Sequence, residues 1–321
     1  MDSLSTISKI IQEKDNFYIL GHIDPDGDCI GSMVVLREIV KKYNKKYNLV
    51  FYNKPDSKYD FILEDDYILY SDINNKNIDW EQINIIALDA GDLERIGKIG
   101  EIKKEILINI DHHHHNPLYG EYNYLDSKAA AVGEILYRLV KEMNVEITLK
   151  ISKAIAVAII QDTGYFRYQN TSAKILRLIA DFMEKGINLY QINKKLYSNH
   201  SLAKMKLKGL ALSTLQRDFK AKVAWLYVDQ DMLSETGSDI SDISGFVNYA
   251  RDIKNVEVGI CFSAINNKQT KVSLRSKDYI PVDKIAEKFS GGGHPRAAGF
   301  IVGKKLTETI KLVIHEVNNF V

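Results

Sequence analysis

The first half of the chain alternates short apolar runs with helix-like patterns, and this alternation limits the possible folds more than any other feature. Strands are expected at 17–20, 48–52, 84–88 and 106–110, with a helix over 30–43 after the first strand. The last three runs are mostly β-branched residues or Leu without polar alternation, which is typical of strands buried on both faces of a parallel sheet. The pattern predicts an α/β domain with a doubly wound, mainly parallel sheet.

The second half begins with helical patterns and ends in a separate strand-rich region. Helices are expected over 132–143, 151–160 and 172–185, and the character of the sequence changes near Gly186. Beyond it, strands are expected at 221–228, 256–264 and 270–274, and helices at 240–250, 282–288 and 306–317. This pattern predicts a smaller α+β domain. The expected organisation is an α/β domain at 1–187, a helical linker at 188–215 and the α+β domain at 216–321, with the active site in the cleft between the domains.

Charge and composition indicate which ligands and which cellular compartment suit this protein. The 321 residues include 43 Lys and Arg against 42 Asp and Glu, which gives a net charge of +1. Affinity for long nucleic acid needs many unbalanced cations, so this balance argues against a groove for a long duplex but allows short anionic ligands. The sequence has no signal-peptide pattern and no run of about 18 apolar residues, and its two cysteines suit a reducing compartment. We therefore expect a cytoplasmic protein that does not enter a membrane.

Polar residues gather where the expected strands and one helix end. They are His22, Asp26 and Asp28 after the first strand, Asp89 after the strand at 84–88, Asp111, His112 and His113 after the strand at 106–110, and Asp162 at the end of an apolar helix. In open α/β sheets, ligands bind outside the carboxyl ends of the strands. A single Asp-x-Asp is often only a turn or a helix N-cap, and Asp28 fits that role. All four groups together favour a ligand site.

This number of Asp and His side chains predicts bound cations, because neighbouring carboxylates repel one another unless a cation lies between them. Carboxylates favour hard cations and imidazoles favour transition metals, so the mixture suits Mn²⁺, with Mg²⁺ or Co²⁺ as substitutes. The ligands exceed the needs of one ion, which favours two ions that share a bridging carboxylate. Such a pair can activate a water and stabilise the leaving oxygen of a displacement at phosphorus.

Several segments resemble the motifs of a known family. GHIDPDGDCIGS, ALDAGD, NIDHHHHN and QDTGYF, in this order, resemble the four motifs of the DHH phosphoesterase superfamily. VSLRS (272–276) and GGGHPRAAGF (291–300) resemble the associated substrate-binding domain, DHHA1, of the subgroup that contains oligoribonuclease/pAp phosphatases, cyclic-di-AMP phosphodiesterases and the RecJ nuclease. The resemblance spans nearly the whole chain and implies a metal-dependent phosphoesterase.

The resemblance also implies roles for the site residues. His22, Asp26 and Asp89 match the ligands of one ion, whereas Asp28, Asp89, His112 and Asp162 match those of the second, so that Asp89 bridges the two. His113 matches the histidine that contacts the phosphate. Asp111 is expected to lie behind the ligands and to orient the His112 imidazole, as carboxylates commonly do at metal sites. The match assigns no role to Asp24, His114 or His115.

The glycine-rich segment of the second region predicts a phosphate clamp. The residues of this predicted clamp are Arg275, Ser276, Gly291, Gly292, Gly293, His294 and Arg296. The glycines permit close backbone approach, and their amides can form a nest for an anion. The histidine and the two arginines can add charge-assisted hydrogen bonds to the same phosphate. Arg167 and Tyr168 either touch substrate or belong to a packed loop.

The predicted activity is hydrolysis of short oligoribonucleotides to mononucleotides, of 3′-phosphoadenosine 5′-phosphate (pAp) to AMP, or of both. The main alternative is a cyclic-di-AMP or pApA phosphodiesterase on the same scaffold. The short chain disfavours a RecJ-type exonuclease, and the glycine-rich segment disfavours a family-II inorganic pyrophosphatase. A non-catalytic nucleotide-binding regulator is disfavoured because candidate ligands occupy every metal position. The sequence leaves substrate preference, cleavage polarity and oligomeric state open. A homodimer is one of the possible oligomeric states.

Overall fold

The structure is a computed structural model that describes residues 1–73, 78–101, 105–198, 200–218 and 222–320, apart from the side chains of 99–101 and of His294. The chain divides into two compact units, Met1–Asn199 and His200–Val321. We call them the first unit and the second unit. Residues 188–215, expected as a helical linker, contain one helix of each unit.

The first unit is built on a six-stranded parallel sheet in the order β3-β2-β1-β4-β5-β6. Its strands are β1 (Phe17–Leu20), β2 (Tyr47–Phe51), β3 (Ile68–Leu69), β4 (Asn84–Leu88), β5 (Ile106–Asp111) and β6 (Gly120–Leu125). The parallel α/β class predicted from the sequence is therefore confirmed. The sequence pattern does not predict β3, which is very short, or β6, in which polar residues interrupt the apolar ones.

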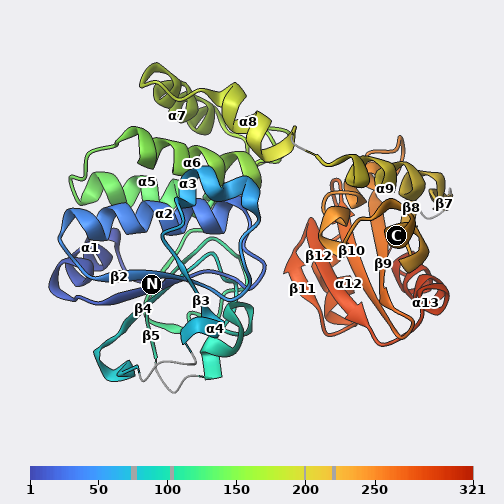
Figure 1. Cartoon of the computed structure of the whole chain (residues 1–321), viewed down its shortest axis with the longest axis horizontal. Helices are drawn as coiled ribbons and strands as arrows, with labels where there is room; N and C mark the ends of the chain where they lie inside the picture. Colours follow the sequence, from blue (N-terminus) through green and yellow to red (C-terminus); the bar gives the residue numbers. More distant parts are fainter. Residues whose placement is uncertain (74–77, 102–104, 199, 219–221, 321) are drawn as a thin grey trace. The chain divides into compact units, whose positions relative to one another are not determined.

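Helices cover the sheet of the first unit. They are α1 (Leu4–Glu13), α2 (Gly27–Lys42), α3 (Asp60–Leu63), α4 (Tyr70–Ile73), α5 (Val132–Glu142), α6 (Leu149–Asp162), α7 (Ala173–Glu184) and α8 (Leu189–Tyr197). Three 3₁₀ turns occupy Ser57–Tyr59, Trp80–Gln82 and Glu94–Glu101. Helices α1, α2 and α5 lie over one face of the sheet, and α6 stacks on α2 and α5 (Figure 1). Because α2 lies between the sheet and α6, it is buried on nearly all sides.

Apolar cores lie on both faces of this sheet. The larger core joins the strands to α1, α2, α5, α6 and α7. The smaller core lies on the opposite face and includes Val50, Ile85, Ala87 and Ile106. This double burial is what the continuous apolar runs predicted, since neither face of these strands meets water.

The second unit holds a mixed sheet in the order β11-β12-β10-β9-β8-β7, in which only the β8–β9 pair is parallel among the pairs described. Its strands are β7 (Gln216–Asp218), β8 (Val223–Val228), β9 (Val258–Asn266), β10 (Gln269–Ser276), β11 (Gly292–His294) and β12 (Ala297–Val302). Its helices are α9 (Leu202–Ser213), α10 (Gln230–Thr236), α11 (Val247–Arg251), α12 (Val282–Glu287) and α13 (Leu306–Asn318). This is the smaller α+β region that the sequence predicts.

The helix expected over 240–250 is wrong as a single element. The structure has a 3₁₀ turn at Ile240–Ile243 and then the short helix α11. Gly245 lies between them with φ +88°, a conformation that breaks helical continuity and that glycine adopts at no steric cost. Among the described helices of both units, none has the length and apolar content that crossing a bilayer demands.

Candidate metal centre

The order of the strands brings the predicted site residues together. β4 lies between β1 and β5, so Asp89, directly after β4, stands between the loop after β1 and the end of β5. The loop after β1 carries His22, and β5 ends at Asp111 with His112 next. The carboxyl ends of parallel strands share one edge of the sheet, which is why residues from three separate segments meet there.

The first turn of α2 supplies two carboxylates. Asp26 is the N-cap of this helix, and its Oδ1 accepts hydrogen bonds from the backbone N–H groups of Asp28 and Cys29 at 3.0 and 3.2 Å. The capping role considered for Asp28 is therefore wrong. Asp28 is fully buried inside the first turn, and it accepts from the backbone N–H groups of Val132 and Gly133, at the start of α5, at 2.6 and 2.9 Å.

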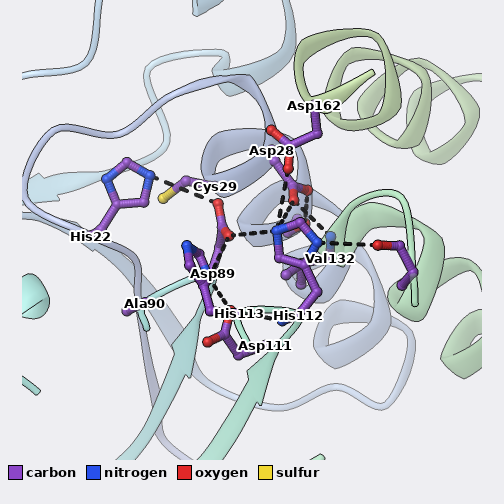
Figure 2. Close-up of polar contacts among 12 residues, drawn as sticks. His22, Asp28, Cys29, Asp89, Ala90, Asp111, His112, His113, Val132 and Asp162 are labelled. Atoms are coloured by element: carbon purple, nitrogen blue, oxygen red, sulfur yellow. Dashed lines mark hydrogen bonds and ion pairs between the residues drawn. The ribbon is translucent and has the colours of Figure 1, made fainter. Parts of the chain in front are cut away.

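Imidazoles and carboxylates form two candidate ligand sets on either side of Asp89 (Figure 2). In the first set, His22 Nε2 lies 3.7 Å from both Asp26 Oδ1 and Asp89 Oδ2. In the second set, His112 Nε2 lies 3.2 Å from Asp162 Oδ2, 3.6 Å from Asp89 Oδ1 and 3.9 Å from Asp28 Oδ2. One oxygen of Asp89 thus faces each set, which is the arrangement that a bridging carboxylate requires.

The backbone of Asp89 is held in an unusual conformation. Its φ is +55°, in the left-handed region that non-glycine residues rarely adopt, although Asp tolerates it better than most. Its N–H donates to the carbonyl of Ile110 at 3.2 Å, which continues the β4–β5 ladder by one residue. Strain of this kind gathers at functional sites, where the surrounding structure imposes it.

Burial and neighbouring charges shift the pKa values of three residues in the cluster. Burial and the carboxylate of Asp162 raise the pKa of Asp28 to about 7. Burial and Asp28 raise the pKa of Asp89 well above its ordinary value. Burial disfavours the charged form of His112, but the hydrogen bond and charge of Asp162 prevail and raise the pKa of His112 to about 10. These three side chains therefore favour their protonated forms, and a divalent ion that bound here would displace those protons.

The donor set fits divalent ions. Three groups of ligand atoms each lie within 4.8 Å of one another: His22, Asp26 and Asp89; Asp28, His112 and Asp162; and Asp89, His112 and His113. Their mixture of carboxylate oxygens and imidazole nitrogens suits Mn²⁺, Co²⁺ and similar ions, and it also accommodates Mg²⁺. The first two groups contain all six residues that the resemblance implied as metal ligands.

Asp111 contacts the ring of His113 rather than that of His112. Asp111 Oδ1 lies 2.7 Å from His113 Nδ1, whereas the Nδ1 of His112 lies 3.3 Å from the carbonyl of Ala129. The expected orienting contact from Asp111 to the His112 ring is therefore wrong: the ring instead meets the carbonyl of Ala129, in the segment before α5. Burial disfavours ionisation of Asp111, yet the hydrogen bond and charge of His113 lower the pKa of Asp111 to about 2.

Other polar residues near these motifs lie at the rim. His114 and His115 are exposed. Asp24 accepts a hydrogen bond from Asn53 Nδ2 at 3.4 Å and is exposed. Arg167 follows three residues with positive φ, Gly164 to Phe166, and its Nε donates to the carbonyl of Gly164 at 2.8 Å. The guanidinium of Arg167 lies 5.6 Å from the centre of the Tyr165 ring.

The glycine-rich segment of the second unit forms a hairpin. Gly292 and Gly293 belong to the edge strand β11, which pairs with β12. A Cβ on Gly291 would lie 2.4 Å from the carbonyl oxygen of Gly299, and one on Gly293 would lie 2.3 Å from that of Ala297. Only glycine permits these close strand contacts.

The cationic residues of the predicted clamp lie beside this hairpin. Arg296 is exposed at its turn, and its Nη1 donates to the carbonyl of Ile280 at 3.0 Å and to Ser276 Oγ at 3.3 Å. Arg275 lies on the neighbouring strand β10, opposite Ala297 of β12. The backbone of His294 belongs to β11, and its side chain lies outside the described part of the structure.

Two residues of NIDHHHHN that the sequence analysis left without a role, Asn109 and Asn116, lie directly behind the site. Asn116 Nδ2 donates to Asp111 Oδ2 at 2.7 Å, and Asn109 Nδ2 donates to Asn116 Oδ1 at 2.9 Å. The only sequence signal for them is that two asparagines flank the DHH triplet. Their pairing depends on the fold of β5 and the loop after it.

Known proteins are similar to this chain over most of its length. Residues 16–160 match the DHH family, N-terminal domain, and residues 219–321 match the DHHA1 domain. The bifunctional oligoribonuclease and PAP phosphatase NrnA of Thermus thermophilus is 31% identical over 282 residues, which cover 88% of this chain and 82% of that protein. The protein of the same name from Bacillus subtilis is 27% identical over 89% of this chain and 88% of its own.

A solved structure agrees with the sequence matches. An exopolyphosphatase-related protein from Bacteroides fragilis has a TM-score of 0.90 and 25% sequence identity to this chain, and the match covers 99% of this chain and 96% of that one. The fold and the acidic, histidine-rich site therefore define a metal-dependent phosphoesterase, which is a hydrolase. The chain belongs to the DHH family and carries a DHHA1 domain in its second unit.

Proposed function

We propose that this protein hydrolyses short oligoribonucleotides to mononucleotides and pAp to AMP. Two similar proteins that cover most of this chain are named for these two activities. The single observation that carries the proposal is the position of Asp89, whose two oxygens face His22 and His112 at 3.7 and 3.6 Å. This geometry supports a pair of divalent ions, with Mn²⁺ as the preferred metal and Mg²⁺ or Co²⁺ as substitutes.

We assign the ligands from the two sets around Asp89. His22 and Asp26 would hold one ion, His112, Asp28 and Asp162 would hold the other, and Asp89 would be shared. When bound, such ions activate a water and neutralise charge on the phosphate. The reaction adds water across a phosphoester: a bond forms from the water oxygen to phosphorus, the bond from phosphorus to the ribose oxygen breaks, and that oxygen takes a proton.

His113 would bind the phosphate. Its Nδ1 faces Asp111 Oδ1 at 2.7 Å, so Nε2 is the ring atom that would reach a substrate oxygen. A donor aimed at the phosphoryl group stabilises the charge that develops on its oxygens in the transition state. Asp111 is fully buried, and its contact with Nδ1 holds the ring in this orientation.

In the second unit, we assign substrate binding to the β11–β12 hairpin and its neighbours. Arg275, Ser276, the three glycines, His294 and Arg296 would bind a phosphate of the substrate that is not cleaved. The exposed guanidinium of Arg296 and the backbone that Gly291 and Gly293 allow to pack closely support this assignment. Such a contact gives affinity for phosphorylated nucleotides over phosphoesters that lack a second phosphate.

A substrate panel tests the proposal. With Mn²⁺, kcat/KM is measured for a diribonucleotide, a longer RNA, pAp, cyclic-di-AMP and pyrophosphate. We expect the diribonucleotide and pAp to be the best substrates and metal-free enzyme to be inactive. A preference for cyclic-di-AMP would favour a cyclic dinucleotide phosphodiesterase instead. No turnover on any member of the panel, with metal bound, would favour a nucleotide-binding protein without catalysis.

A further inference from the structure

A buried network of asparagines lies behind Asp111 in the first unit. Asn109 on β5, Asn116 in the following loop and Asn123 on β6 are each at most 9% exposed. Asn109 Nδ2 donates to Asn116 Oδ1 at 2.9 Å and to Asn123 Oδ1 at 3.2 Å. Buried amides cost stability unless they are hydrogen-bonded, and a fully bonded network fixes the positions of its members.

Asn116 is the member of this network that reaches the site. Besides its bond to Asp111 Oδ2 at 2.7 Å, its Nδ2 lies 3.3 Å from the carbonyl of Ala90 and 3.4 Å from Asn109 Oδ1. Its Oδ1 also accepts from the backbone N–H of Leu118 at 2.9 Å, which orients the amide. The donor face of Asn116 is therefore directed at Asp111 by the acceptor bonds on its other side.

Asp111 is in turn bonded on both oxygens. Oδ1 receives the N–H of His112 at 2.8 Å and lies 2.7 Å from His113 Nδ1 (Figure 2), while Oδ2 receives Asn116. A carboxylate with only the first oxygen fixed could rotate about its last side-chain torsion, and the imidazole would lose its partner. The bond from Asn116 to the second oxygen prevents that rotation.

We propose that Asn116 is a positioning residue for phosphoester hydrolysis, which acts through Asp111 to fix the orientation and tautomer of His113. This inference rests on the proposed function of the same site. Asn109 is the neighbour that bonds Asn116 directly and holds it against β5.

The structure offers two matched controls. Asn116 also contacts the carbonyl of Ala90, which follows the proposed bridging ligand Asp89. Its removal could therefore affect the site through Ala90 as well as through Asp111. Tyr119 Oη donates to that same carbonyl at 2.8 Å, and Tyr119→Phe removes this contact without touching the Asn116–Asp111 bond. Asn123→Ala removes another buried amide of the network at a distance from Asp111, and so reports the effect of lost stability alone.

The test compares Asn116→Ala with both controls in the full chain. We expect kcat on pAp and on a diribonucleotide to fall about 10- to 100-fold in Asn116→Ala, the usual effect of removing a partner behind a site, while KM and metal stoichiometry stay unchanged. Tyr119→Phe and Asn123→Ala should retain kcat. If Asn116→Ala does not fold, Asn116→Ser replaces it, because its hydroxyl can still satisfy Asn109 but is shorter than the amide that bonds Asp111.

A second measurement does not depend on turnover. The ¹⁵N signals of the His113 ring, assigned with His113→Gln, report its tautomer in metal-free and Mg²⁺-loaded enzyme. We expect a fixed Nδ1–H form in the wild type and in both controls, and altered His113 signals in Asn116→Ala. Unchanged signals, a metal loss that matches the fall in kcat, or an equal fall in Asn123→Ala would overturn the proposal. A wild type that is inactive on the substrates would refute the proposed function, while these signals would still decide the role of Asn116.

Discussion

Asp89 allows a direct test of the metal centre at the scale of one residue. Its two oxygens face the two ligand sets, so Asp89→Ala should abolish turnover and lower the bound metal below two ions per chain. Metal content is measured by elemental analysis after dialysis, and the fold by circular dichroism. Asp92→Ala is the matched control, because Asp92 is an exposed carboxylate of the same loop. Two fully occupied ions in Asp89→Ala would contradict the bridging role.

The two neighbouring histidines should separate into different roles. His112 faces three carboxylates, whereas His113 is tied to Asp111, so His112→Gln should lose metal and His113→Gln should keep it. We expect kcat of His113→Gln to fall about 10²- to 10⁴-fold, as for a lost general acid–base or charge-stabilising group. Steady-state kinetics with metal analysis checks this, with the exposed His114→Gln as control. Equal metal loss in both variants would show that the roles are reversed or shared.

Single residues of the site could be predicted from the sequence where they directly follow an apolar strand, but not where their contacts depend on the conformation of a loop. His22, Asp89 and His112 could be placed from the sequence because each follows a strand whose apolar run is unmistakable. The ring that Asp111 contacts could not be predicted. His112 and His113 follow Asp111 directly, and the backbone conformation at the end of β5 decides which of the two rings faces it. The contacts of Asn116 depend on a loop conformation that no periodic pattern encodes.

At the scale of elements, two helices that carry proposed ligands cross very closely. A Cβ on Gly31 of α2 would lie 2.4 Å from the carbonyl oxygen of Ala154 on α6. Gly31→Val should therefore push α2 from α6 and lower the free energy of unfolding by about 1–3 kcal/mol, as overpacked cores do. Urea denaturation measures this. Gly209→Ala on α9, where nothing lies within 4 Å, should instead stabilise by up to about 1 kcal/mol. A neutral Gly31→Val would show that the helices separate without cost.

The elements themselves were predictable where the pattern is continuous. β1, β4 and β5 and the helices that follow apolar stripes occur close to where the sequence places them. β6 was not predicted because polar residues alternate with its aromatic and apolar ones. The helix expected over 240–250 is interrupted at Gly245, and the sequence does not reveal that this glycine has a positive φ. The sequence of the β11–β12 hairpin is typical of a loop because it is rich in glycine. In the structure these glycines instead allow close packing between strands.

At the scale of the whole molecule, metal removal should lower thermal stability. Burial and neighbouring carboxylates raise the pKa values of Asp28 and Asp89, and a bound cation would relieve this repulsion, so we expect ions to stabilise the folded chain. A ligand at about 100 times its Kd adds about 2.7 kcal/mol. For a unit of this size that corresponds to a fall of roughly 5–10 °C in Tm on metal removal. Calorimetry with and without chelator measures the shift, and Asp89→Ala should show a smaller one. An unchanged Tm in the wild type would contradict a metal centre built from buried ligands.

The two units should contribute different parts of the kinetics. The proposed metal ligands all belong to the first unit, and Arg296 belongs to the second, so Arg296→Ala should leave metal content unchanged. Loss of a charged hydrogen bond of ~1.5–3 kcal/mol lowers kcat/KM on pAp roughly ten- to hundredfold. Hydrolysis of bis(4-nitrophenyl) phosphate, which has no second phosphate, should change little.

A control is needed because Arg296 also bonds the carbonyl of Ile280 and Ser276 Oγ, so its removal can loosen the hairpin. Lys271→Ala removes an exposed cation from β10 of the same sheet without those bonds, and it should affect neither substrate. Equal losses on pAp and on the small diester in Arg296→Ala, with a lowered Tm, would mean that Arg296 supports the fold of the second unit. A loss confined to pAp at unchanged Tm is the result expected of a residue that binds the phosphate that is not cleaved.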